Sequence, residues 1–119
     1  MAHYVDGFIL AVPKKKLAAY RRLATLGSKI WREHGALDYR ECVADDVKRG
    51  KWTSFPRAVK LKPGETVVIA YIVYRSRADR DRVNKKAMND KRLANMSPAS
   101  MPFDAKRMIF GGFKTLVAR

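Results

Sequence analysis

Apolar residues along the chain fall into strand-like stretches separated by helix-like ones. The stretches 4–12, "YVDGFILAV", and 66–74, "TVVIAYIVY", are rich in β-branched and aromatic residues, which is typical of strands. The second is apolar without a break, so we expect a central strand buried on both faces. Apolar and polar residues alternate in 37–45, "LDYRECVAD", and residues 106–117, "KRMIFGGFKTLV", form a last apolar run. The pattern therefore predicts four strands.

Two stretches have helical periodicity instead. From Lys14 onward apolar residues recur at helical spacing until Gly35, a residue type that commonly ends helices. A second helix is predicted from Ser76, which forms a weak capping box with Asp79, through about Leu93. We expect the inner face of this second helix to carry Val83, Ala87 and Met88. Residues 45–65 show no lasting period and predict a long connection, in which "TSFPRAVK" could form a short helical turn.

The predicted order is β-α-β-β-α-β, the ferredoxin-like arrangement of the α+β class, in one domain over residues 1–119. In this arrangement two helices cover one face of an antiparallel sheet. The strands, however, are apolar on both faces, so the second face needs a cover as well. The simplest cover is the same face of a second copy, which predicts a homodimer.

Composition narrows the class of protein. The 119 residues are 47% hydrophobic, enough for a single folded core. No apolar run approaches the roughly 20 residues that span a bilayer, and the N-terminus does not resemble a signal peptide. We therefore expect a cytoplasmic protein that has no membrane partner. With a single cysteine the chain cannot form an intrachain disulfide. The cysteine and the two histidines do not have the spacing of a zinc site, and we expect neither a metal nor a cofactor.

The charge raises the question of a polyanionic partner. There are 26 Lys and Arg against 11 Asp and Glu, a net charge of +15, which favours contact with nucleic acid through counterion release. The basic residues fall in three separate places rather than in one patch. A solvated surface would explain them equally well, and both interpretations remain open.

Two carboxylates are candidates for site chemistry. Strand alternation places Asp6 on the face that carries Phe8, and Glu41 on the face that carries Tyr39. Desolvation among apolar neighbours raises the pKa of a carboxyl unless a cation pairs with it, and either state can serve acid–base chemistry. The alternative is an ion pair that joins strands or subunits, with an arginine such as Arg40, Arg57 or Arg107.

Two further residues are candidates for the mouth of a pocket. His34 directly precedes the helix-ending Gly35, so it could act as a base or simply interact with the helix C-terminus. Trp52 lies in a basic loop and could form a lid or a dimer contact.

The glycine pair in "RMIFGGF" could cradle a phosphate or leave a strand bare. A phosphate loop opens a helix, and too few residues follow for one. In the ferredoxin-like order the last strand lies beside the first, so Gly111 and Gly112 are expected near Asp6 and Gly7. Such a bare patch would let a helix pack closely or would leave a hollow beside Asp6. The predicted pocket residues are Asp6, Glu41, His34, Tyr39, Trp52, Arg107, Gly111 and Gly112.

Several short motifs resemble the YbaA-like family of small bacterial proteins, domain-of-unknown-function family 1428. These are "YVDGF", "EC" followed by "DDVKRGK", "FPRAV", "ETVV" and, most specifically, "MPFDAKRMIFGGF". The resemblance runs from Tyr4 to Phe113 and implies the dimeric α+β barrel superfamily, in which two such sheets pack face to face. The family commonly carries an aromatic after Glu41 and Cys42, where this chain has Val43, so a pocket lined there would be altered.

Two functions compete at this point. The first is a small-molecule binding protein or a cofactor-independent enzyme with a pocket between sheet and helices, because superfamily relatives include enzymes and ligand-sensing domains. The second is RNA binding, because the RNA recognition motif has the same strand and helix order. Here "AYIVY" fits only the latter half of the motif's signature, and a barrel would bury the sheet face that RNA needs, which makes nucleic acid the less favoured partner.

Overall fold

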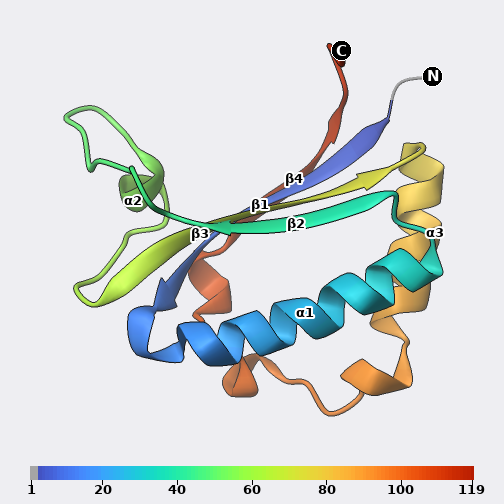
Figure 1. Cartoon of the computed structure of the whole chain (residues 1–119), viewed down its shortest axis with the longest axis horizontal. Coiled ribbons are helices and arrows are strands. Elements are labelled where there is room, and N and C mark those ends of the chain that lie inside the picture. The colour runs from blue at the N-terminus through green and yellow to red at the C-terminus, as the bar shows by residue number, and fades with distance from the viewer. Residues whose placement is uncertain (1–2) are drawn as a thin grey trace.

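The computed structural model describes residues 3–119 as one four-stranded antiparallel sheet with helices on one face (Figure 1). The strands are β1 (Tyr4–Pro13), β2 (Asp38–Val43), β3 (Glu65–Tyr74) and β4 (Ile109–Lys114). Their spatial order is β2-β3-β1-β4, so β3 has the central position that its unbroken apolar run predicted, and β1 lies beside it. This order confirms the ferredoxin-like fold of the α+β class.

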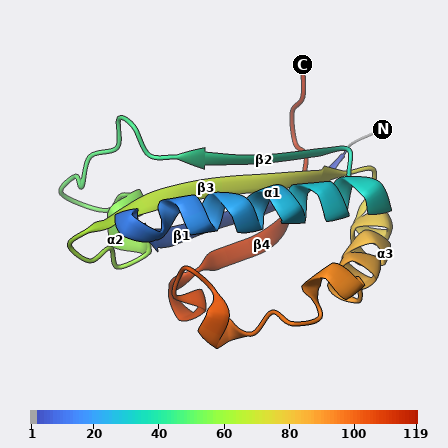
Figure 2. The same cartoon turned by 60° about the horizontal axis from the view of Figure 1, so that its bottom comes forward.

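Two longer helices lie against the same face of the sheet (Figure 2). They are α1 (Leu17–His34), which follows the 3-10 turn η1 (Lys14–Lys16), and α3 (Arg77–Met88). Apolar side chains of alternate strand positions meet them there: Leu10 and Val68 pack with Tyr20 of α1. Ile72 and Tyr74 pack with Val83 of α3. We call this the helix face of the sheet. No helix in residues 3–119 is long and apolar enough to cross a membrane.

Helix α3 begins where the capping pattern predicts but ends earlier than expected. The Ser76 side chain accepts a hydrogen bond from the Asp79 N–H at 3.1 Å. The chain leaves the helix after Met88, and Asp90 accepts the Arg92 N–H at 3.0 Å to begin the separate turn η2 (Lys91–Leu93). Met88 is 68% exposed, so its predicted place on the inner face was wrong, whereas Val83 and Ala87 are buried as expected.

The C-terminal strand is also shorter than its apolar pattern suggested. The turns η3 (Pro98–Ser100) and η4 (Ala105–Arg107) precede it, and β4 ends at Lys114. Leu116 and Val117 follow β4 and are largely exposed. An apolar run alone does not fix a strand's end, because pairing stops where the partner strand β1 begins at Tyr4.

The opposite face of the sheet, here called the open face, carries no helix over most of its area. Ile69 of the central strand β3 is 44% exposed here, so the predicted burial of that strand on both faces does not hold at Ile69 in the single chain, although Val67 of β3 is buried. On the edge strand β4, Ile109 and Phe113 are 44% and 62% exposed. Only one end is covered: the connection containing α2 (Phe55–Ala58) packs Val59 against Ala11 and Val67. The expected helical turn in that connection is confirmed.

Candidate functional site

A groove of about 510 Å³ lies between α1 and β2 on the helix face. It is lined by Leu17, Tyr20, Arg21, Ala24, Thr25, Ser28, Tyr39, Glu41, Cys42, Val43 and Val68. Most of these side chains are apolar or aromatic, and the formal charges among them are those of Glu41 and Arg21. A mostly apolar hollow with a few convergent polar groups is the usual form of a small-molecule site.

The Glu41 carboxylate is the polar centre of this groove. Its Oε2 accepts a hydrogen bond from the Tyr39 hydroxyl at 2.7 Å, and its Oε1 accepts one from the Tyr20 hydroxyl. Burial, and next the hydrogen bond and charge of Glu41, raise the pKa of both tyrosines far above the ordinary value of 10.0. Both hydroxyls are therefore protonated donors at physiological pH.

Helix α1 is shaped to admit this arrangement. Tyr20 lies one turn before Ala24 on the inner side of the helix, and Gly27 follows on the same side. A Cβ on Gly27 would lie 3.2 Å from the Tyr39 hydroxyl oxygen, closer than most real contacts of this kind. Glycine at this position lets the hydroxyl reach Glu41 beside the helix backbone.

The arrangement leaves Glu41 able to accept one more hydrogen bond at each oxygen, because a carboxylate oxygen has two lone pairs. A ligand that carries an ammonium, amine or hydroxyl group can supply that donor. The two tyrosines fix the position of the carboxylate that would receive this donor. The apolar wall of Leu17, Val43 and Val68 can hold a ligand's hydrocarbon body.

Asp6 does not belong to this groove, although strand alternation correctly placed it on the helix face. Asp6 is 5% exposed, and its carboxylate accepts a hydrogen bond from Arg80 of α3 at 2.6 Å. The Arg80 guanidinium also lies 5.0 Å from the centre of the Tyr4 ring. An ion pair with arginine was the expected alternative, but the three arginines proposed were the wrong partners.

The glycine pair lies beside Asp6 and Gly7 as predicted. In the β1–β4 ladder Gly112 pairs with Asp6 and Gly111 pairs with Gly7. The idea of one bare patch was wrong, because alternation sends the positions to different faces. Gly112 belongs to the helix face, where Tyr4 and Arg80 fill the space next to it. Gly7 belongs to the open face, and a Cβ built on Gly7 would lie 3.7 Å from the Phe113 ring. On the helix face the buried Asp6 carboxylate meets Arg80.

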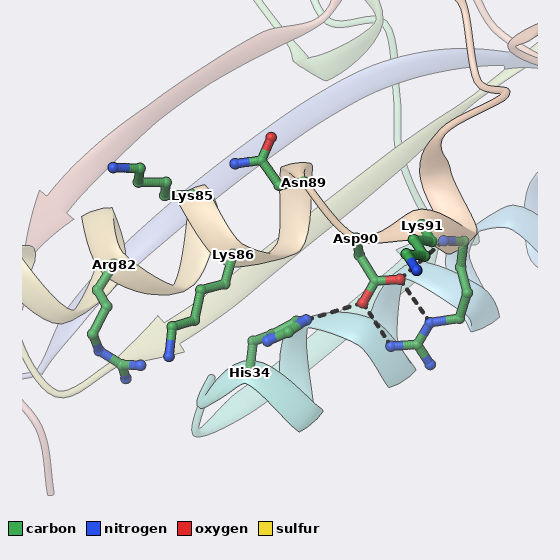
Figure 3. A pocket seen from close by; sticks show the side chains of 8 residues that line it. His34, Arg82, Lys85, Lys86, Asn89, Asp90 and Lys91 are labelled. Carbon is green, nitrogen blue, oxygen red and sulfur yellow. Dashed lines mark hydrogen bonds and ion pairs between the residues drawn. The ribbon is translucent and has the colours of Figure 1, made fainter.

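His34 lies at a second hollow, of about 820 Å³, where α1, α3 and η2 meet (Figure 3). Its Nε2 is 3.0 Å from Asp90 Oδ2. The Asp90 carboxylate is also hydrogen-bonded by the side chain and backbone of Arg92, and these bonds, with that of His34, hold its pKa far below the usual range. The structure therefore separates His34 from Glu41 and gives it a carboxylate partner.

Two other predicted pocket residues lie elsewhere. Trp52 is 93% exposed and does not line the groove. Arg107 makes two hydrogen bonds to the Glu65 carboxylate, at 2.8 and 2.7 Å, and another to Asp104 at 3.1 Å. The guanidinium lowers the pKa of Glu65, and the pair fastens η4 to the start of β3.

Sequence reasoning missed Tyr20 and Arg80 as partners of the two carboxylates. Tyr20 falls on the inner face of the helical pattern that begins at Lys14, and that signal could have identified it as a donor once a carboxylate was expected there. Arg80 is one basic residue in a long charged run, and its distance of 74 positions from Asp6 left no local signal.

The sheet, its helix layer and the tyrosine-bound carboxylate define a ferredoxin-like α+β protein with a candidate small-molecule groove. The chain belongs to the family described as "Protein of unknown function (DUF1428)", whose sequence profile matches residues 3–105. It is 47% identical over 114 residues to "Uncharacterized protein YbaA" of Escherichia coli K12, covering 96% of this chain and 97% of that protein. The same identity and coverage hold for the protein of that name in Shigella flexneri.

A solved structure supports the fold independently. A protein from an uncultured marine organism, described as a dimeric ferredoxin-like protein, matches with a TM-score of 0.57 at 13% sequence identity. The match covers 100% of this chain and 98% of the marine protein. At this identity the likeness concerns the fold alone.

Proposed function

We propose that this protein binds a small organic molecule in the groove between α1 and β2. The observation that carries the proposal is the Glu41 carboxylate, held by two tyrosine hydroxyls inside an open, mostly apolar groove. A carboxylate held only for stability is commonly paired with a cation, as Asp6 is with Arg80 in the same sheet. Glu41 has two neutral donors instead and faces a space that a ligand can fill.

The groove's chemistry favours a ligand with an apolar body and a hydrogen-bond donor at one end. The donor would approach the free lone pairs of Glu41, and an ammonium group would make the stronger, charge-assisted bond. Val43 lines the groove at the position where the family commonly has an aromatic, so the groove here is wider than the resemblance would suggest. The body of the ligand would occupy that width.

Ligand-observed NMR with three probes of one ring size tests the proposal: tyramine, 4-ethylphenol and 4-hydroxyphenylacetate. We expect saturation transfer to tyramine and less or none to the carboxylate, because Glu41 repels an anion. Thr25→Trp should abolish the transfer, since Thr25 is exposed and lines the groove. Ala18→Trp is the matched control on the same helix, exposed and outside the groove. Equal saturation transfer in both variants would overturn the proposal. So would the absence of transfer to any probe at 10 mM with the wild-type protein, because a Kd of 10 mM corresponds to about 2.7 kcal/mol of binding free energy.

We also propose that two copies associate through their open faces. Ile69, Ile109 and Phe113 are exposed there, and such an apolar face on a four-stranded sheet normally meets a partner. The marine protein of the same fold is described as dimeric, which supports the idea by analogy. A sheet-to-sheet dimer would leave both grooves open, because they lie on the opposite face.

The same face argues against RNA as the main partner. An RNA-binding sheet stacks bases on aromatic rings of its two central strands. On the open face β1 carries Val5 and Ile9, and β3 carries Ile69, Tyr71 and Val73. The two central strands thus offer one ring among aliphatic side chains, and the Phe113 ring lies on the edge strand β4. Such a face is a poor stacking platform and a better interface for an apolar partner.

A further inference from the structure

The hollow beside His34, here called the basic hollow, collects part of the chain's excess positive charge. It is lined by His34, Arg82, Lys85, Lys86, Asn89, Asp90, Lys91 and Arg92. Five of these residues are cationic and one is anionic. No ion pair involves Lys85, Lys86 or Lys91 within residues 3–119, so their charges are not neutralised by the protein itself.

Arg82 is held in place at the edge of the basic hollow. Its Nε and Nη2 donate to Asp79 Oδ1 at 3.1 and 2.6 Å. Its Nη2 also lies against the backbone of Gly35: a Cβ there would be 3.0 Å away. Gly35 has a φ of 123°, which favours glycine in any case. The guanidinium is thus fixed before any ligand arrives, while its side chain remains 48% exposed.

Two more groups lie near this guanidinium. Lys86 is one helical turn after Arg82 on the same side of α3, a spacing that places side chains next to each other. His34 directly precedes Gly35, against which Arg82 packs, and Figure 3 shows the Lys86 and Arg82 side chains on the side of α3 that faces His34. A fixed guanidinium and a mobile ammonium are two donor types that bind a phosphate oxygen. The Nε2 of His34 is already hydrogen-bonded to Asp90, so His34 lines the hollow without being counted as a phosphate ligand.

We propose that the basic hollow binds the phosphate group of a small phosphorylated molecule. Asp79 holds the Nε and Nη2 of Arg82, so Arg82 would donate from the N–H groups of Nη1 on an oriented guanidinium. Lys86 supplies a second charge, and the volume of about 820 Å³ leaves room for the rest of the molecule. Asp90 and Glu33 both pair with Arg92, and the salt bridges within residues 3–119 leave the charges of Lys85, Lys86 and Lys91 without a carboxylate partner. The carbonyl ends of α1 and α3 lie nearby and oppose an anion, so the affinity is expected to be millimolar. The site is separate from the Glu41 groove and does not depend on it.

The test is a titration of ¹⁵N-labelled protein with glucose 6-phosphate, inorganic phosphate and glucose, followed by amide chemical shifts. We expect saturable shifts at Gly35 and Lys86 with glucose 6-phosphate and none with glucose. Inorganic phosphate distinguishes the two sources of the anion: equal affinity for it would assign the site to free phosphate, and weaker affinity to a phosphate ester. Absence of saturation with both anions would overturn the proposal.

Matched variants separate a built site from diffuse charge. Lys86→Gln should weaken glucose 6-phosphate binding by about fivefold, because it removes one charge-assisted hydrogen bond at an exposed site. Lys15→Gln removes the same charge from an exposed residue in the turn before α1 and should change binding less than about twofold. Equal losses of glucose 6-phosphate affinity in the two variants would overturn the proposal and assign the charge to a general polyanion surface. Tighter binding of a labelled single-stranded oligouridine, weakened equally by both variants, would lead to the same conclusion.

Discussion

Gly112 lies directly opposite Asp6 in the β1–β4 ladder, and the space that a side chain at Gly112 would occupy is filled by the partner of Asp6. A Cβ there would lie 2.8 Å from Arg80 Nη1 and would overlap the Tyr4 ring. The missing side chain therefore lets an arginine from α3 reach a buried carboxylate on the central strand. This glycine makes room for the ion pair.

We expect Gly112→Ala to lower the free energy of unfolding by about 2 kcal/mol, because Tyr4 and Arg80 must move to admit the new methyl group. Gly7→Ala is the matched control in the same pair of strands. Its Cβ would lie 3.7 Å from the Phe113 ring, an ordinary contact, so the change should stay within about 0.5 kcal/mol. Urea unfolding followed by circular dichroism measures both, and equal losses would contradict the packing described at Gly112.

The Asp6–Arg80 pair gives a second prediction. Arg80→Met keeps much of the side chain's length but leaves the buried Asp6 side chain without its partner, which costs about 3 kcal/mol of stability. Arg77→Met, at an exposed position of the same helix, removes the same charge and should cost less than about 0.5 kcal/mol. Thermal and urea unfolding of the two variants provide the comparison. Similar losses of stability in the two variants would show that the change in net charge, and not the loss of the buried ion pair, explains the destabilisation.

Most of the fold could be predicted because it depends on local patterns. The apolar periods of β1 and β3 and the stop at Gly35 gave the right elements, and strand order then placed Gly112 beside Asp6. The ends of α3 and β4 could not be predicted, because a cap at Asp90 and the length of a partner strand decided them.

The candidate site was predicted only in part, for a physical reason. Alternation placed Glu41 and Tyr39 on one face, and they do lie together in the groove. The partners of the two carboxylates come from helices far away in sequence, so no spacing rule could choose Tyr20 or Arg80 among similar residues. Trp52 and Arg107 were chosen by residue type in a loop and near a strand, and residue type does not determine where a loop packs.

The buried tyrosines predict a loss of stability in alkali. Tyr20 and Tyr39 have folded-state pKa values above the ordinary 10.0, so below pH 10 their contribution to stability is complete. Above pH 10 an unfolded tyrosine releases its proton while the folded one keeps it, and stability falls by about 1.4 kcal/mol per pH unit for each residue.

The variant that replaces both tyrosines with phenylalanine should therefore show a flatter decline above pH 10, although it is less stable at pH 7 because Glu41 loses both donors. Tyr20→Phe alone should flatten the decline of stability above pH 10 about half as much as the double variant does. Urea unfolding at several pH values, with tyrosinate absorbance as a second signal, measures both. An unchanged slope in the double variant would contradict the buried, protonated hydroxyls.

The open face predicts how association depends on salt and on one aromatic residue. Two chains of net charge +15 repel each other, so a dimer must be held by apolar contact, and added salt should strengthen it by screening that repulsion. Phe113→Lys places a charge on the exposed part of this face and should weaken the dimer at least about tenfold. Met88→Lys, at an exposed apolar residue on α3, is the control and should leave association unchanged.

Sedimentation velocity at two salt concentrations, with native mass spectrometry, measures these effects. A wild type that stays monomeric at micromolar concentration, or a dimer that salt dissociates, would contradict an apolar sheet-to-sheet interface.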